Sequence, residues 1–159
     1  VLKGHIAVAS FKLNKNSYGD KIDQSARKFL RDINLDYPHG TGHGVGYFGN
    51  VHEGPQAISR GNKVKFKEGM ITSNEPGYYK KGHFGIRIEN LVYVKRTKDK
   101  LKFEDLTLVP IDKTLIEKKL LTSSERHWLN KYHQRVFVCL KKYMNKLELT
   151  QLKLACSDI

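Results

Sequence analysis

Apolar residues recur at helical spacing in two stretches near the start of the chain. The first stretch, residues 1–12, predicts a helix with three apolar side chains on one side, Leu2, Ile6 and Ala9. The second helix is predicted from Asp20, and its apolar positions are Ile22, Ala26, Phe29, Leu30 and Ile33. We expect it to end near Asn34, because Pro38 cannot lie far inside a continuing helix. Residues 14–19 have the composition of a turn.

Short β-prone runs separated by glycine fill residues 37–95. The strands predicted there are Val45–Phe48, Ala57–Ser59, Met70–Asn74 and Ile86–Val94, with 64–66 as a half-exposed strand or loop. Residues 96–100 are predicted to form a charged turn, and Phe103–Pro110 a further strand.

The last part of the chain is predicted to be helical. Thr122-Ser-Ser-Glu125 has the pattern of a capping box, in which the threonine and glutamate side chains satisfy amides at a helix start. The whole pattern predicts an α/β chain of the α+β type. Residues 1–111 would form helices beside an antiparallel sheet, and residues 112–159 a helical tail.

Composition narrows the class of protein. The 159 residues are 39% apolar and 28% charged, which favours a globular domain over a disordered or membrane protein. The net charge of +13 is spread from Lys3 to Lys153 without a nucleic-acid-binding motif, which argues against nucleic acid as a partner. Two cysteines make no disulfide framework, so we expect a reducing, cytoplasmic location. Because the chain begins with Val1, we expect it to be a piece of a longer protein.

Three histidines and two isolated carboxylates are the candidate chemistry. His39, His43 and His52 lie in a glycine-rich segment, and Glu75 and Glu89 follow in and beside predicted strands. Imidazole and carboxylate groups together are the donors that a hydrolytic metal site needs, and divalent cations would remove the repulsion between two carboxylates. Taken singly, each has a plainer interpretation: a histidine in a loop, or a glutamate paired with Arg87.

These residues match the motifs of one family. The segments Gly40-Thr-Gly-His-Gly-Val-Gly46, Asn50-Val-His-Glu-Gly-Pro55, Asn74-Glu-Pro-Gly77 and Arg87-Ile-Glu-Asn90 resemble aminopeptidase P, the Xaa-Pro aminopeptidase of peptidase family M24. The resemblance is to the C-terminal part of the catalytic domain in the cytosolic, three-domain eukaryotic type. It implies the pita-bread fold shared with creatinase and methionine aminopeptidase, and removal of the N-terminal residue from peptides with proline second.

The resemblance also implies a metal pair, normally Mn²⁺, held by two aspartates, one histidine and two glutamates. His43 matches the histidine ligand, and Glu75 and Glu89 match the glutamates, with Glu89 bridging both ions. Such an oxygen-rich donor set favours manganese, although Zn²⁺ or Co²⁺ could occupy it in vitro. A homodimer is expected by the same resemblance, which places residues 112–159 near the dimer contact.

Three further residues match active-site positions of the family. His52 matches a histidine that binds substrate or moves a proton, and His39 matches a histidine that contacts substrate. Arg87 matches an arginine that orients its neighbouring carboxylate.

The chain departs from the family pattern in one respect. The family has two aspartate ligands, and their sequence context is not found around Asp20, Asp23, Asp32 or Asp36. We therefore expect the two aspartate ligands to lie in an upstream segment, just before Val1. A non-catalytic pita-bread scaffold that binds protein or nucleic acid is the alternative function, supported by the basic charge.

Overall fold

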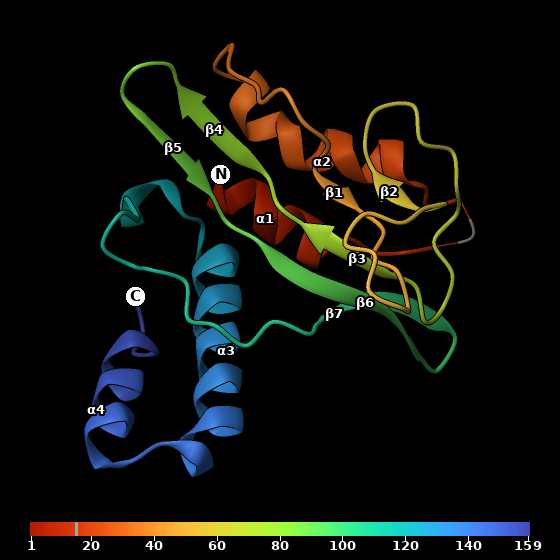
Figure 1. Cartoon of the computed structure of the whole chain (residues 1–159). Coiled ribbons are helices and arrows are strands. Elements are labelled where there is room, and N and C mark those ends of the chain that lie inside the picture. The colour runs from red at the N-terminus through yellow and green to blue at the C-terminus, as the bar shows by residue number, and fades with distance from the viewer. Residues whose placement is uncertain (15) are drawn as a thin grey trace. The chain divides into compact units, whose positions relative to one another are not determined.

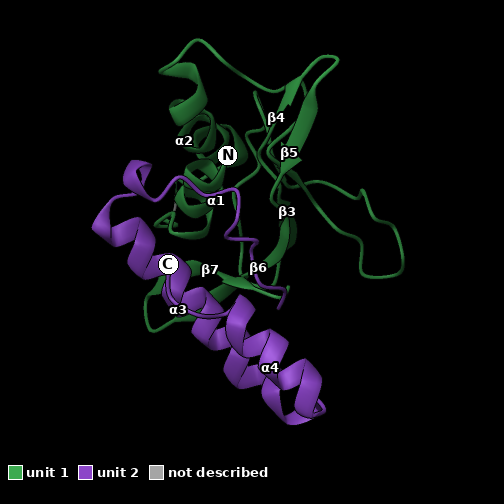
Figure 2. Ribbon diagram, turned by 90° about the vertical axis from the view of Figure 1, so that its left-hand side faces the viewer, with its two compact units in different colours: residues 1–107 green, residues 108–159 purple. Residues whose placement is uncertain are grey.

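A computed structural model describes residues 1–14 and 16–159. The chain divides into two compact units, 1–107 and 108–159 (Figure 2), and the boundary falls slightly before the predicted one. The turn predicted at 14–19 includes residue 15, which lies outside the described residues.

Two helices open the first unit. Helix α1 covers Leu2–Ala9 and helix α2 covers Gly19–Arg31, so both predicted helices form, each a little shorter than expected. Ile22, Ala26 and Leu30 of α2 are buried as the spacing predicts. The same helix also buries Asp23 and Arg27, which the apolar pattern did not reveal.

The strands of the first unit are short and antiparallel (Figure 1). They are β1 (Gly42–His43), β2 (Ala57–Ile58), β3 (Ile71–Asn74), β4 (Gly77–Lys80), β5 (Phe84–Arg87), β6 (Asn90–Thr97) and β7 (Lys100–Asp105). Pairing joins β1 with β2, β4 with β5, and β3, β6 and β7 in that order. The core between helices and strands contains Val8, Leu13, Ile22, Ala26, Ile58, Phe66, Val92, Val94 and Phe103. This α+β arrangement agrees with the predicted fold class.

Two predicted strands differ from the structure. The strand predicted over Val45–Phe48 does not form; residues 47–48 lie in a turn, because the Gly46 amide donates to the Asn50 carbonyl (2.8 Å) and the chain reverses. The strand predicted over Phe103–Pro110 is β7, which ends at Asp105. Beyond it the amides of residues 106 and 107 both reach the Leu91 carbonyl, so the regular ladder stops there.

The strand predicted over Ile86–Val94 is divided into β5 and β6. Its two parts pair with different strands, because Arg87 lies opposite Gly77 of β4 whereas Asn90 lies opposite Asn74 of β3. The register on both sides of the break is the same. Strands β3 and β4 on one side and β5 and β6 on the other thus form one antiparallel two-stranded ribbon. Its pairing is interrupted only around residues 75–76 and 88–89 (Figure 1).

The second unit is helical. It contains two short 3-10 turns, Lys118–Leu120 and Lys141–Tyr143, and two helices, α3 (Ser123–Leu140) and α4 (Lys146–Ala155). The capping box predicted at Thr122 is present at the start of α3. The Tyr132 hydroxyl donates to the Val109 carbonyl (2.8 Å), which fixes the segment preceding these helices within the unit.

Throughout the described parts of the chain, every helix is too short or too polar to span a membrane. Both cysteines are free, as the sequence predicts.

Candidate metal centre

The interruption in the ribbon brings two carboxylates face to face. Glu75 follows the last residue of β3, and Glu89 precedes the first residue of β6. Since Asn74 pairs with Asn90, the next positions of the same register are Glu75 and Glu89. The Glu75 amide donates to the Thr41 carbonyl (2.7 Å), which ties this end of β3 to the chain entering β1.

Glu89 was predicted to lie inside the strand Ile86–Val94, and the structure corrects this. The Glu89 side chain is 41% exposed, because the strand is broken at this residue. A cation is therefore favoured here because two carboxylates lie close together, and not because one carboxylate is buried.

Close backbone packing positions His43 on β1. A Cβ atom added at Gly42 would lie 2.0 Å from the Ser73 carbonyl oxygen, and one at Gly44 would lie 2.0 Å from the Glu53 carbonyl oxygen. Only glycine fits at these two positions, because the backbone at Ser73 and Glu53 already occupies the space. The His43 amide donates to the Ser73 hydroxyl (2.9 Å), and that hydroxyl donates to Glu75 Oε1 (2.8 Å).

The donor atoms of three predicted ligands converge. One donor atom from each of His43, Glu75 and Glu89 lies within 4.8 Å of the other two. His43 Nε2 lies 3.2 Å from Glu75 Oε1, and His43 Nδ1 lies 3.0 Å from the Gly44 carbonyl oxygen. A carbonyl oxygen only accepts, so Nδ1 carries a proton and Nε2 is the nitrogen directed at the carboxylates.

This donor set fits a divalent cation. In the neutral ring, the Nε2 lone pair faces a carboxylate oxygen, and two carboxylates face each other across the ribbon. A cation among these atoms would turn both unfavourable contacts into favourable ones. One imidazole and two carboxylates are donors of the kind that Mn²⁺ and Zn²⁺ accept.

Arg87 lies beside both carboxylates. Its Nε atom is 3.4 Å from Glu89 Oε2 and 3.8 Å from Glu75 Oε2. The hydrogen bond to the Tyr79 hydroxyl, followed by the charges of Glu89 and Glu75, raises the pKa of Arg87 above its usual value. Arg87 therefore remains a cation in contact with both carboxylates.

Tyr79 connects this arginine to His39. The His39 Nδ1 atom lies 2.7 Å from the Gly40 carbonyl oxygen, so Nδ1 carries the proton of the neutral ring. His39 Nε2, 2.8 Å from the Tyr79 oxygen, then accepts from the tyrosine hydroxyl, whose oxygen accepts from Arg87. A continuous path of ion pairs and hydrogen bonds thus leads from the carboxylates to the predicted substrate histidine.

Two glycines determine where the Tyr79 ring lies. Gly85 is the cross-strand partner of Tyr79, and Gly77 is two residues before it on the same face. Added Cβ atoms would meet the ring, at 2.8 Å from Gly85 to Cδ1 and at 2.5 Å from Gly77 to the hydroxyl oxygen. The ring thus lies flat across the ribbon, which directs its hydroxyl toward His39 and Arg87.

His52 also reaches the centre. Its ring centroid is 4.1 Å from that of His43, with an interplanar angle of 59°. The residue itself is exposed, unlike half-buried His43. Of these two histidines, His52 is therefore the more accessible to a molecule in solvent.

Two residues that contact the predicted site residues, Tyr79 and Ser73, were not predicted from the sequence. Tyr79 had one available signal, since it alternates with Gly77 immediately after the acidic motif and shares a face with it. Ser73 had none, because its hydroxyl matters only through contacts with residues thirty positions upstream and two positions downstream.

Comparison with known proteins decides the family. Residues 1–96 match metallopeptidase family M24, and residues 99–159 match the C-terminal region of peptidase M24. This chain belongs to metallopeptidase family M24. The family assignment confirms the resemblance seen in the sequence.

The most informative relatives are Xaa-Pro aminopeptidases. The chain is 46% identical to Probable Xaa-Pro aminopeptidase P of Botryotinia fuckeliana, over 94% of this chain and 25% of that protein. It is 50% identical to that of Coprinopsis cinerea, over 86% of this chain and 24% of that protein. The chain thus spans about a quarter of the length of these M24 relatives.

A solved structure supports the pita-bread fold. X-prolyl aminopeptidase of Caenorhabditis elegans, described as a cytosolic enzyme with a di-nuclear active site, superposes with a TM-score of 0.91 at 40% identity. The match covers all of this chain and 28% of that enzyme. X-Pro aminopeptidase of Thermotoga maritima matches 69% of the chain, with a TM-score of 0.60. The described chain is therefore part of a pita-bread domain.

Proposed function

We propose that this chain supplies one side of a two-cation centre in an aminopeptidase that removes the first residue from peptides with proline in the second position. The observation that carries the proposal is the convergence of His43, Glu75 and Glu89 to within 4.8 Å. Relatives named Xaa-Pro aminopeptidase P and the di-nuclear site of the C. elegans enzyme support it.

The donors within this chain would fill part of the centre. His43, Glu75 and Glu89 would together hold the ions from this side. Two aspartates from an upstream segment would complete the set. Bound divalent cations would polarise the scissile carbonyl and supply a nucleophile by lowering the pKa of water.

The remaining residues act on the substrate and on the ligands. Arg87 holds the two carboxylates in place through its contacts with Glu75 and Glu89. His52, exposed beside His43, would bind the substrate near the scissile bond and move a proton. His39, oriented by Tyr79, would contact the peptide.

The alternative of a non-catalytic scaffold has less support. Its only motivation is the net charge of +13, whereas such a scaffold has no need for three converging metal donors. Mn²⁺ as the metal, a homodimer and a cytoplasmic location remain parts of the proposal.

Hydrolysis of Arg-Pro-Pro tests the function. The protein should be prepared at the full length of its relatives, loaded with Mn²⁺, and compared on Arg-Pro-Pro and Arg-Ala-Pro. We expect release of free arginine from the first peptide alone, and loss of that release in Glu89→Gln. Absence of turnover by protein that demonstrably binds two Mn²⁺ ions would refute the proposal.

A further inference from the structure

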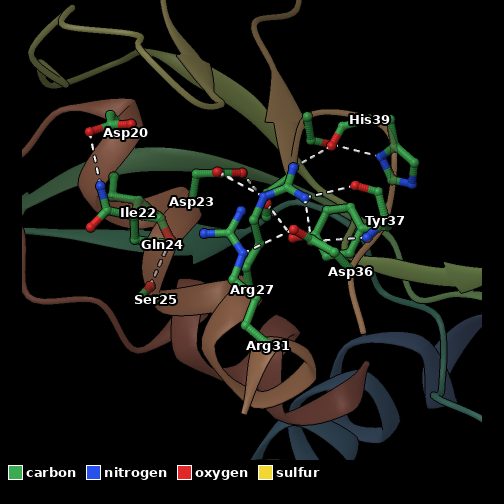
Figure 3. A network of polar contacts seen from close by, with 12 residues as sticks. Asp20, Ile22, Asp23, Gln24, Ser25, Arg27, Arg31, Asp36, Tyr37 and His39 are labelled. Atoms are coloured by element: carbon green, nitrogen blue, oxygen red, sulfur yellow. Dashed lines mark hydrogen bonds and ion pairs between the residues drawn. The ribbon is translucent and has the colours of Figure 1, made fainter. Parts of the chain in front are cut away.

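A buried arginine lies next to the segment that carries His39. Arg27, on helix α2, is 6% exposed, and its guanidinium is surrounded by groups from residues 36–39 (Figure 3). Nη1 donates to Asp36 Oδ1 (2.7 Å) and to the Tyr37 carbonyl (2.8 Å), and Nη2 donates to the His39 carbonyl. The guanidinium also stacks on the Tyr37 ring, 3.9 Å from its centroid.

This segment has no regular structure to hold it. Residues 36–40 belong to neither a helix nor a strand, so their carbonyls have no ladder partners. A buried carbonyl needs a donor, and a planar guanidinium offers several at fixed angles. Arg27 thus replaces the backbone pairing that a strand would give.

The other side of Arg27 is fixed as well. Its Nε donates to Asp23 Oδ2 (2.8 Å), one turn earlier on α2. Asp23 Oδ1 accepts from the Thr41 hydroxyl (2.6 Å), and the Tyr37 hydroxyl is also bonded to that of Thr41. The ends of the segment are thus both attached to one helix, by Arg27 at residues 36–39 and by Asp23 at residue 41.

The position of the His39 backbone decides where its ring lies. The ring has one hydrogen bond to its own neighbour, Gly40, and one to Tyr79 of strand β4. The bond to Tyr79 joins residues forty positions apart, and therefore requires that the main chain at residue 39 be fixed relative to the sheet. The Arg27 bond to the His39 carbonyl supplies that restraint.

We propose that Arg27 is a positioning residue for the peptidase reaction: by binding the carbonyls of Tyr37 and His39, it holds the His39 imidazole against Tyr79 for contact with the substrate. This rests on the proposed function. Arg27 does not touch the metal ligands. It acts on substrate binding through His39 and leaves the cation site intact.

The principal test is Arg27→Lys in the full-length protein. Lysine keeps the charge but cannot reach Asp23 and both carbonyls at once. We expect kcat/KM on Arg-Pro-Pro to fall about 10- to 100-fold, mainly through KM, with Mn²⁺ affinity unchanged in calorimetric titration. In a His39→Ala background the same substitution should have no further effect, because nothing remains to be positioned.

A second variant guards against misfolding. Pro38 is exposed and lies between the two carbonyls that Arg27 binds. Pro38→Gly frees the same backbone without disturbing a buried charge, and should raise KM in the same direction. The matched control is Arg31→Gln. Among the described residues, Arg31 is bonded to Asp36 (2.9 Å) and to neither carbonyl, so this change should leave KM unaltered.

The outcomes separate this proposal from the one on which it rests. Equal effects of Arg27→Lys with and without His39, or a parallel loss of Mn²⁺ affinity, would overturn the positioning role. If the wild-type protein cleaves no Xaa-Pro peptide, the proposed function fails. Crystal structures of wild type and Arg27→Lys then still decide the positioning role, since the bond from His39 Nε2 to Tyr79 should be present in the first and lost in the second.

Discussion

Glu75 and Glu89 occupy opposite positions at the break of a single antiparallel ribbon. Strands β3 and β6 before the break and β4 and β5 beyond it share one register, which places the two carboxylates directly across from each other. Arg87 lies within 4 Å of both, and His43 Nε2 lies 3.2 Å from Glu75. Directly opposite residues of an antiparallel pair lie on the same face, which brings the two carboxylates together.

Replacement of one facing carboxylate should separate metal binding from folding. Glu89→Gln removes a like-charge contact, so the melting temperature in EDTA should stay the same or rise. At Mn²⁺ a hundredfold above the Kd, the wild type should gain about 2.7 kcal/mol, and the variant should lose most of that gain. Calorimetric melts with and without Mn²⁺ measure both quantities. Glu68→Gln, at an exposed carboxylate bonded to Arg96, should keep the full shift.

Gly85→Ala should displace the Tyr79 ring. The new methyl group would lie 2.8 Å from Tyr79 Cδ1, so the ring must move and its hydroxyl must leave His39 Nε2. We expect kcat/KM to fall about tenfold or more. Tyr79→Phe, which removes the same hydroxyl, should lower activity to a similar extent, and the double variant should be no worse. An additive loss in the double variant would show that the glycine matters for another reason.

Thr41→Val should destabilise the domain. The substitution keeps the shape of a fully buried side chain but removes the hydroxyl that donates to Asp23 Oδ1. A buried carboxylate that loses a donor lowers the free energy of unfolding by about 1–3 kcal/mol. Urea denaturation followed through the transition of this domain would measure it. Thr97→Val, at an exposed strand end, should change it by less than about 0.5 kcal/mol.

His5 should make stability depend on pH. Burial lowers the pKa of His5 to about 4, against weaker opposing effects from the backbone at Ile88 and Asn74. Because the folded pKa lies below the unfolded value of about 6.5, the unfolded chain binds the proton first as pH falls. The stabilisation is complete above pH about 6.5 and is lost down to about pH 4, a change on the order of 3 kcal/mol.

Urea midpoints measured from pH 4 to pH 7 test this. His5→Gln should flatten the slope, whatever its effect at neutral pH. His83→Gln, at an exposed histidine of the same unit, should leave the slope as in the wild type. An unchanged slope in His5→Gln would assign the pH dependence to another group.

Local patterns in the sequence determined the helices, most strands and the candidate metal donors. The apolar spacing placed α1 and α2, the capping box placed the start of α3, and the motifs singled out His43, Glu75 and Glu89. These features depend on neighbours within a few positions, or on residue types that the chemistry requires. The chain itself therefore carries them.

Only the tertiary structure decided how those donors are held. The break between β5 and β6, the Tyr79 ring lying over Gly77 and Gly85, and the Arg27 contacts with residues 36–39 arise from the pairing of distant segments. Asp23 and Arg27 resemble ordinary surface charges in the sequence of an amphipathic helix. Their burial is compensated because the fold brings carbonyls and a hydroxyl to them, and linear spacing does not encode such long-range contacts.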